Sequence, residues 1–192
     1  MCMLVHMTSR DAAATRRRIL EQARRQFARH SFAAVTVKSV ADAAGVSPNL
    51  ITRYFGGKDG LFLAATRVEL PVENSFDGDR SALGSRLAAS IVRRWFGAPG
   101  EDPLLVLQRA SGERPQAAEA LAAFLDTNSL EPLHRYLRAS GLDDAEAFSR
   151  AAAIDAFVLG VSTRRRVLRA ALGDPAELQA WLGTTIQRLA DG

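Results

Sequence analysis

The amino-acid sequence predicts an all-α fold, in which a three-helix N-terminal head precedes a longer helical bundle. Apolar residues recur every three or four positions in nearly every segment after residue 10, the spacing that covers one face of a helix. No segment shows the apolar–polar alternation of a half-buried strand. With 192 residues, 47% hydrophobic and 24% charged, the chain is long enough for one or two domains with a core.

The first predicted helix spans about residues 11–29 and carries Ile19, Ala23 and Phe27 on one face. Its outer face is rich in arginine. The run Arg16–Arg18 is expected to be a solvated face, and the alternative is that one of these side chains reaches a phosphate. A fourth helix is expected to start near Lys58 and to end at about residue 70, because Pro71 cannot continue it. The inner face of that helix consists of Leu61, Phe62, Ala65 and Val68.

Between these helices, residues 36–58 predict two short helices joined by a tight turn. Thr36 is a suitable N-cap for the first, and Gly45 is the residue type that favours its end. Ser47 is a second N-cap, Pro48 occupies the first helical position, and Gly56-Gly57 ends the second helix. The apolar stripe of the first helix is Val37, Val40, Ala41 and Ala44. This helix-turn-helix geometry places a second helix in the DNA major groove.

The charge distribution supports a DNA-binding head. Residues 1–67 contain eleven Lys or Arg against four Asp or Glu, a net charge of +7, so the other residues carry −3 of the total of +4. A surface that faces phosphates requires such an excess.

A polar stretch at residues 73–81 is the best boundary between the head and the rest. Helices are then expected at about residues 81–96, 103–110, 115–139, 143–169 and 175–190, with Pro132 able to kink the third. The first of them has an apolar ladder at intervals of four: Leu83, Leu87, Ile91 and Trp95.

With its flanks, the motif resembles the TetR family of bacterial transcriptional repressors over about residues 15–66. The matching features are the basic first helix with Phe27, the segment VTVKSVADAAGVSP, and the recognition helix within NLITRYFGGKDGLF. The Tyr-Phe-Gly ending and the segment LLVLQRAS are similar to an actinobacterial-looking branch. The opening residues 1–10 are expected to form a disordered tail. The resemblance implies a DNA-binding domain at 11–57 and a helical effector-binding and dimerisation domain at 58–192.

Two features depart from the family pattern. The family often has Tyr at the position of Thr52 and His at that of Tyr54, so base preferences cannot be transferred from better-known relatives. The Gly that usually follows the first helix is also absent. His30-Ser31 occupies this corner, and one of the two is expected to adopt a left-handed backbone conformation.

We assign Val46, Ile51 and Phe55 to the core of the head, which leaves the other faces for DNA. Asn49 and Thr52 suit base edges, and the remaining polar groups suit bases or phosphates. The alternative is that these residues only solvate a surface helix. The predicted contacts are Thr36, Pro48, Asn49, Leu50, Thr52, Arg53, Tyr54 and Lys58.

The resemblance also implies a homodimer formed by the last two helices and an effector pocket enclosed by the others. Small residues permit close helix approach, and an apolar face on the last helix would pack against a partner; the alternative is that both helices are monomer core. The expected interface residues are Ala152, Ala156, Gly160, Trp181, Leu182, Ile186 and Leu189. The expected pocket residues are Trp95, Phe96, Phe124, Asn128, Phe148 and Asp155, any of which is alternatively plain core.

Several polar groups have more than one interpretation. Asp155 lies in an otherwise apolar segment and needs a partner, which is either Arg109, a ligand or an interface group. Arg164–Arg166 is a solvated face or a partner contact. Glu131 and His134 form a single E-x-x-H, whereas helical di-metal sites need two such motifs and further carboxylates. We therefore expect no catalytic residue, no metal and no cofactor.

The sequence thus predicts a dimeric regulator that binds a near-palindromic duplex and is released by a small apolar or amphipathic effector. The alternatives are a ligand-independent regulator or activator and, in a different class, a helical small-molecule carrier or enzyme. Cys2 is the single cysteine, and no apolar run has the length of a membrane span. A cytoplasmic protein without a membrane partner is expected.

Overall fold

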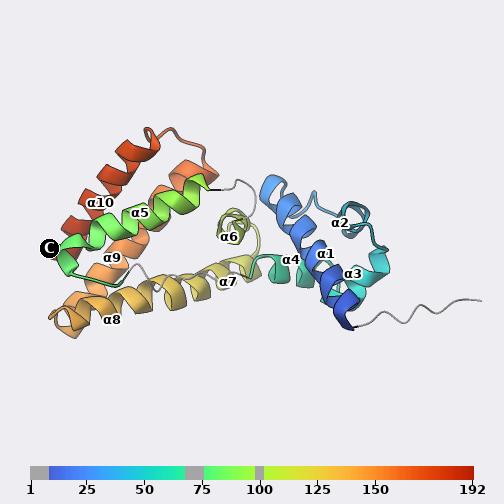
Figure 1. The fold of residues 1–192 in the computed structure, drawn as a ribbon, viewed down its shortest axis with the longest axis horizontal. Helices are drawn as coiled ribbons and strands as arrows, with labels where there is room; N and C mark the ends of the chain where they lie inside the picture. The colour runs from blue at the N-terminus through green and yellow to red at the C-terminus, as the bar shows by residue number, and fades with distance from the viewer. Residues whose placement is uncertain (1–8, 68–75, 98–101) are drawn as a thin grey trace, which may run out of the picture. The chain divides into compact units, whose positions relative to one another are not determined.

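The computed structural model describes residues 9–67, 76–97 and 102–192, so most of the expected tail lies outside the described residues. Helices make up the regular structure of this part of the chain, which contains no strand, and the all-α prediction is confirmed (Figure 1). The α-helices are α1 (Ser9–Arg29), α2 (Val37–Ala44), α3 (Pro48–Phe55), α4 (Lys58–Ala65), α5 (Leu83–Phe96), α6 (Pro103–Ala110), α7 (Pro115–Leu125), α8 (Glu131–Ala139), α9 (Asp144–Ser162) and α10 (Pro175–Asp191).

The chain divides into two compact units, one of residues 1–67 and 100–110 and one of residues 68–99 and 111–192. The division differs from the expected boundary at residues 57–58, because α4 belongs to the first unit. The ring of Phe62 on α4 makes edge contacts with Phe27 at 5.1 Å and with Phe32 at 5.2 Å between ring centroids. Leu61 and Ala65 are also buried. These aromatic and apolar contacts make α4 part of the core of the head.

Helix α6 was expected in the second domain, and in the structure it groups with the first unit. The guanidinium of Arg109 donates a hydrogen bond to the carbonyl oxygen of Ala28 at 2.6 Å, and α6 packs against α1. A cation is favoured at that position because the last carbonyl groups of a helix lack intrahelical partners. Val106 and Leu107 are buried.

The remaining head helices follow the prediction closely. Ile19, Ala23 and Phe27 of α1 are buried. Helix α4 ends at residue 65 rather than 70, where the hydroxyl of Thr66 donates to the carbonyl of Phe62 at 2.8 Å. The expected inner-face residue Val68 lies outside the described residues.

The corner after α1 does not need a left-handed residue, so that prediction is wrong. Among the described residues other than glycine, Arg169 has a positive φ, of 57°, and neither His30 nor Ser31 does. Instead, the carbonyl of Ser31 accepts from the amides of Ala34 and Val35, and its hydroxyl accepts from Ala34. A serine side chain can close a turn locally in this way.

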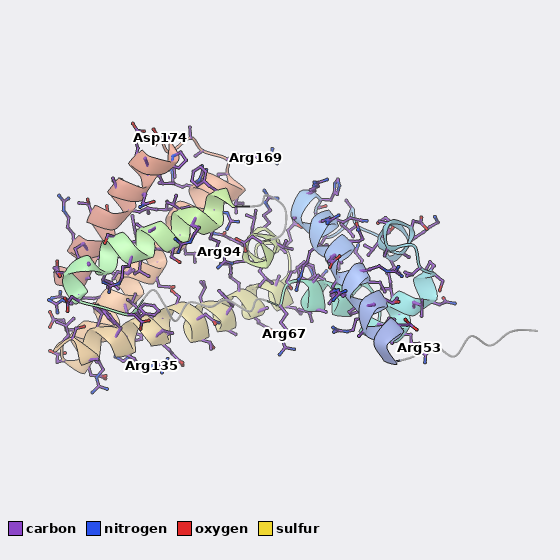
Figure 2. The ribbon with its side chains drawn as sticks, in the orientation of Figure 1. Arg53, Arg67, Arg94, Arg135, Arg169 and Asp174 are labelled. Carbon is purple, nitrogen blue, oxygen red and sulfur yellow. The ribbon has the colours of Figure 1, made fainter. Side chains whose placement is uncertain are left out.

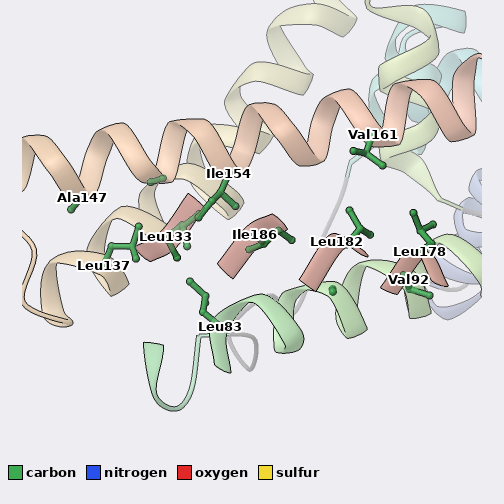
Figure 3. Close-up of a cluster of buried hydrophobic side chains, with 13 residues drawn as sticks. Leu83, Val92, Leu133, Leu137, Ala147, Ile154, Val161, Leu178, Leu182 and Ile186 are labelled. Atoms are coloured by element: carbon green, nitrogen blue, oxygen red, sulfur yellow. The ribbon is translucent and has the colours of Figure 1, made fainter. Parts of the chain in front are cut away.

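The second unit is built around one apolar cluster contributed by α5, α8, α9 and α10 (Figure 3). Its fully buried large side chains include Leu83, Leu133, Leu137, Ile154, Leu178, Leu182 and Ile186. The predicted α5 ladder is only partly correct. Leu83 is fully buried, but Leu87, Ile91 and Trp95 are half-buried at the edge of the cluster. The buried stripe of α5 runs instead through Gly84, Ala88 and Val92.

Small residues on that stripe let α5 approach α10. A Cβ at Gly84 would lie 2.2 Å from the carbonyl oxygen of Gly183 on α10, and a Cβ at Gly183 would lie 3.6 Å from the Cβ of Ala88. The side chain of Gln187 reaches across as well and accepts from the amide of Gly84 at 2.9 Å. Close helix packing here therefore depends on a glycine and an alanine of α5 facing a glycine of α10.

Two π-helical turns interrupt the long helices. The predicted helix over residues 115–139 contains such a turn at η3 (Asp126–Leu130), directly before Pro132. Because proline has no N–H for the α-helical ladder, a wider turn at this point accommodates it without ending the helix. A second π turn, η4 (Thr163–Val167), ends α9 and contains the three consecutive arginines.

Candidate nucleic-acid interface

The first helix of the motif is fixed at both ends. The hydroxyl of Thr36 accepts from the amide of Ser39 at 2.9 Å, and the hydroxyl of Ser39 accepts from the amide of Thr36 at 3.2 Å. Gly45 ends α2 in the left-handed conformation with φ of 64°. Val40, Ala41 and Ala44 are buried. This reciprocal cap and the glycine turn determine where α3 begins.

The second helix starts and ends where the sequence predicts. Ser47 is at the N-cap with an extended backbone, Pro48 follows in the first turn, and Gly56 ends α3 with φ of 74°. The side chain of Ser47 makes no capping hydrogen bond to the described residues. Ile51 is fully buried, so it anchors α3 to the head.

Most of the predicted contact residues on α3 face away from the core. Pro48, Asn49, Thr52 and Arg53 are exposed, and Leu50 and Tyr54 are half-buried. Figure 2 shows the side chain of Arg53 at the outer edge of its unit. The exposed polar groups offer donors and acceptors along one side of a short helix, the arrangement needed to read base edges.

Aromatic contacts hold the C-terminal end of α3. Phe55 lies beneath the guanidinium of Arg16 on α1, 5.1 Å from the ring centroid, and contacts the ring of Tyr54 at 6.3 Å. Phe55 and Val46 are half-buried rather than fully buried, so they belong to the edge of the core. Arg16, expected in a solvated run, therefore links α1 to the recognition helix through a cation–π contact.

Lys58 is more constrained than the sequence indicates. Its ammonium group lies 4.3 Å from the ring centroid of Phe32 and donates to the carbonyl of Ala33 at 3.3 Å. These contacts hold the side chain beside the loop that precedes α2. Lys38 on α2 is exposed and pairs with Asp42 at 2.7 Å, which raises the pKa of Lys38 through the hydrogen bond and the charge of the carboxylate.

In the second unit, the structure separates the expected pocket residues into two groups. Trp95, Phe124, Asn128 and Asp155 are half-buried. Phe96 is 39% exposed and Phe148 is 51% exposed, so these two lie on the surface and do not form the wall of an enclosed pocket within one chain. The ring of Phe148 packs edge-on against His134.

Asp155 has a partner in its own unit. Burial raises the pKa of its carboxyl group, a hydrogen bond with Ser129 in the π turn η3 opposes this, and the nearby charge of Asp126 adds to the increase. Arg109 belongs to the first unit, as Ala28 does, and donates its hydrogen bond to the carbonyl of Ala28. The expectation of an Asp155–Arg109 pair is therefore replaced by separate contacts for each group.

A surface groove of about 930 Å³ runs along α5 and α10 in the second unit. Ser85, Ala180, Thr184 and Gln187 are among the residues that line it, and none of the predicted pocket residues does. Its lining consists of small and polar side chains, which does not resemble the apolar enclosure expected for the effector.

The predicted interface residues also fall into two groups. Leu182 and Ile186 are fully buried in the core of their own unit, so neither is available to a second copy, and this part of the prediction is wrong. Ala156 and Gly160 are exposed on α9, and Trp181 is 48% exposed on α10. Ala152 and Leu189 are half-buried.

His134 makes contacts that do not require a metal. Its Nε2 atom lies 3.2 Å from a carboxylate oxygen of Asp144, which also lies 3.2 Å from Arg138. In the described part of the chain, no three His, Cys, Asp or Glu side chains are grouped so as to hold a metal ion. Within the same residues, every helix is too short or too polar to cross a membrane.

Curated relatives match the head of the chain. Two examples are the transcriptional repressor AcnR of Corynebacterium glutamicum, 45% identical over 53 residues, and the transcriptional regulator BetI of Brucella anthropi, 46% identical over 52 residues. The match to AcnR covers 28% of this chain and 28% of that relative. The match to BetI covers 27% of each.

Solved structures match nearly the whole fold at low sequence identity. NalD, the secondary repressor of the MexAB-OprM multidrug efflux pump in Pseudomonas aeruginosa, has a TM-score of 0.72 at 22% identity and covers 93% of this chain and 97% of its own. A regulator from Saccharomonospora viridis, solved with choline, has a TM-score of 0.69 at 22% identity, over 91% of this chain and 96% of its own.

Family models match both the N-terminal and the C-terminal part of the chain. The model for bacterial regulatory proteins of the tetR family matches residues 19–65, and the model for the tetracyclin repressor-like C-terminal domain matches residues 82–189. The second match alone covers more than half of the chain. The helix-turn-helix geometry, the fold and both matches agree, and the chain belongs to the TetR family of bacterial regulatory proteins.

Proposed function

We propose that this protein is a dimeric transcriptional repressor that binds a near-palindromic DNA duplex through α3 and is released by a small apolar or amphipathic effector. The observation that carries the proposal is the recognition helix itself. Ile51 is fully buried, while Asn49, Thr52 and Arg53 are exposed on a head with a charge of +7. That combination provides both base readout and phosphate attraction.

The polar side chains of α3 are proposed to contact different parts of the DNA, according to their chemistry. Asn49 and Thr52 read base edges by hydrogen bonding, and Arg53 pairs with guanine or with a phosphate. Tyr54, whose ring is held against Phe55, bonds a phosphate through its hydroxyl. The N-terminal ends of α2 and α4 favour phosphate through the helix dipole, and Thr36 and Lys58 lie at these two ends.

A second copy is needed because one short helix reads too few base pairs for genomic specificity. Two heads on a near-palindrome occupy successive major grooves about 34 Å apart. The proposed interface is the exposed side of α9 and α10, with Ala156, Gly160 and Trp181. The ring centroids of Trp181 and Phe157 of α9 lie 5.5 Å apart, so Trp181 packs against α9, the helix that carries the small residues.

Release by an effector is a shift between two conformations of the dimer. An effector that binds better to the conformation whose heads cannot span both grooves lowers the population that binds DNA. Trp95, Phe124, Asn128 and Asp155 are the proposed effector residues. Two proteins of this fold hold small organic molecules, choline in the Saccharomonospora viridis regulator and imidazole in the multidrug-binding protein EbrR.

The test starts from DNA that the purified protein retains from fragments of its own genome. We expect binding to that duplex to weaken steeply with salt. The Arg53→Ala and Tyr54→Ala variants should each lose about tenfold or more in affinity, as expected for a lost base or phosphate contact. Arg135→Ala, an exposed arginine of the second unit, removes the same charge elsewhere and should bind as the wild type does.

Near-zero affinity of the wild-type protein for every fragment, or equal affinity of all three variants, would contradict the proposal. The carrier or enzyme alternative predicts the first of these results. A ligand-independent regulator predicts normal DNA binding that no small molecule reduces.

A further inference from the structure

The aromatic end of the recognition helix is held from two sides by other helices of the head. The backbone of Phe55 lies against α4, where a Cβ at Gly60 would collide with the carbonyl oxygen of Phe55. On α1, which runs beside α3 (Figure 1), the guanidinium of Arg16 lies 5.1 Å from the centroid of the Phe55 ring. Helix α4 therefore restrains the backbone of Phe55, and Arg16 contacts its side chain.

The chain that follows Phe55 does little to fix the orientation of its ring. Gly56 and Gly57 have φ of 74° and 114°, in the region that glycine enters without steric cost and where its backbone is least restricted. Helix α3 is only eight residues long and packs against α2 and α4, its neighbours in the chain. The side chain of Arg16 adds a contact from α1 at the end of α3 where the local backbone is weakest.

The restrained ring lies next to a residue proposed to bind DNA. The ring centroids of Phe55 and Tyr54 lie 6.3 Å apart, with 68° between the ring planes. Tyr54 is half-buried, so part of its ring is covered by protein atoms. A hydrogen bond tolerates only a few tenths of an ångström in distance. A change in the position of the Phe55 ring is therefore expected to displace the polar end of Tyr54.

Arg16 differs from the next arginine of its run in what it contacts. Arg17 lies 3.9 Å from Glu21 of the same helix, and its side chain is 77% exposed. That pair stays within α1, whereas Arg16 contacts a different helix. A guanidinium is planar and is attracted to the face of an aromatic ring, so the contact favours one orientation of the ring.

We propose that Arg16 is a positioning residue for sequence-specific DNA binding. It holds the Phe55 ring and, through it, the C-terminal end of α3 with Arg53 and Tyr54, and it does not act as a phosphate ligand. The inference rests on the DNA-binding function proposed above for α3. Non-specific binding depends mainly on phosphate charge, whereas a displaced recognition helix loses its contacts with base edges. Arg16 therefore affects the preference for the correct duplex over random DNA.

The test measures affinity by fluorescence anisotropy for two duplexes of equal length, the one that the protein retains from its genome and a random one. The readout is the ratio of the two affinities, because a lost phosphate contact weakens both and cancels. Arg16→Ala should lower this ratio about threefold, the scale of an exposed cation–π contact. Arg17→Ala removes the same charge from the adjacent position and is the matched control, with an unchanged ratio.

The salt dependence separates the two roles that Arg16 could have. As a positioning residue, it leaves the slope of log affinity against log salt concentration unchanged when it is replaced by alanine. A phosphate contact would instead lower the slope by about one and would weaken binding to both duplexes.

A double-mutant cycle shows whether the effect passes through the ring. Phe55→Leu removes the ring and keeps an apolar side chain, and in that background Arg16→Ala should lower the ratio no further. Phe55→Tyr keeps the ring, and there Arg16→Ala should again lower the ratio about threefold. The unfolding temperature of each variant without DNA shows that it is folded.

An unchanged ratio for Arg16→Ala would overturn the proposal, as would an equal loss in the wild-type and Phe55→Leu backgrounds. In either case, DNA binding that depends on Arg53 would still support the function proposed above. If the wild-type protein prefers no genomic fragment to the random duplex, the DNA-binding function is wrong and the positioning role of Arg16 is wrong with it.

Discussion

At the scale of single residues, the two helices of the motif start with different capping chemistry. The side chain of Thr36 takes part in a reciprocal cap with Ser39, whereas Ser47 occupies the same position of α3 without a capping bond to the described residues. Proline in the first turn of α3 reduces the need for one, because it has no N–H to satisfy. The sequence pattern at the two sites is similar, but the contribution of each side chain differs.

The first prediction compares these two caps. Thr36→Ala removes the hydrogen bond that the Thr36 hydroxyl accepts from the amide of Ser39. It should lower the free energy of unfolding by about 1 kcal/mol. Ser47→Ala removes no such bond and should change it by only a few tenths of a kcal/mol. Urea unfolding measures both variants. Equal destabilisation by the two substitutions would show that the capping bond of Thr36 contributes nothing to stability.

The second prediction concerns the pH dependence that Asp155 contributes. Burial raises its folded-state pKa, so the folded protein binds this proton more tightly than the unfolded chain does. Stability therefore decreases as the pH rises from the ordinary carboxyl pKa through the raised one, and the cost persists at neutral pH. Asp155→Asn removes the charge and keeps a polar group for Ser129. The variant should be more stable than the wild type at neutral pH.

Urea unfolding of Asp155→Asn at neutral and at mildly acidic pH checks this. The difference from the wild type should shrink as the pH falls through the raised pKa, because Asp155 is then protonated in the folded protein. Asp77→Asn, at an exposed carboxylate, is the control. A variant that is less stable than the wild type at neutral pH would mean that the charged form of Asp155 is favourable in the fold.

At the scale of elements, the contact between α5 and α10 requires small residues because the two helix backbones approach closely. Small residues on both helices allow it, and the backbone carbonyl of Gly183 occupies the space where a Cβ of Gly84 would lie. Backbone atoms cannot move aside as a flexible side chain can. The sequence predicted that Leu87 and Ile91 are buried, but the buried residues are their neighbours Ala88 and Val92. The prediction missed this face because glycine and alanine give no strong apolar signal.

The third prediction tests that contact. Gly84→Ala places a Cβ 2.2 Å from the carbonyl oxygen of Gly183 and should lower the free energy of unfolding by about 1–3 kcal/mol, the usual cost of overpacking. Gly112→Ala, where a Cβ meets no atom within 4 Å, should have little effect. Thermal and urea unfolding distinguish them. An unchanged stability of Gly84→Ala would mean that the two helices separate easily.

At the scale of the whole molecule, the proposed function requires two copies of the chain. The core explains part of the apolar face of α10, since Leu182 and Ile186 are fully buried within their own unit. What remains for a partner is the exposed side of α9 and α10, where Ala156 and Gly160 lie and where Trp181 is half exposed. Small residues permit close approach of a second copy, and an exposed aromatic side chain offers it apolar contact area.

The fourth prediction follows from this surface. The wild-type protein should have the mass of a dimer by light scattering at micromolar concentration. Ala156→Arg places a long charged side chain in the interface and should give a monomer, while Ala123→Arg, on the exposed side of α7, should remain dimeric. A monomeric wild type, or a dimeric Ala156→Arg with unchanged dissociation, would contradict the proposed interface.

The sequence by itself determined the helical class, the positions of the motif helices and the burial of Ile51, because each depends on local spacing, caps and turn residues. Only the tertiary structure decided that α6 packs with the head and that Leu182 and Ile186 belong to the core. The same holds for the cation–π contact between Arg165 and the ring of Phe96. These outcomes depend on contacts between segments far apart in the chain. An apolar helix face predicts burial, but it does not identify the surface that buries it.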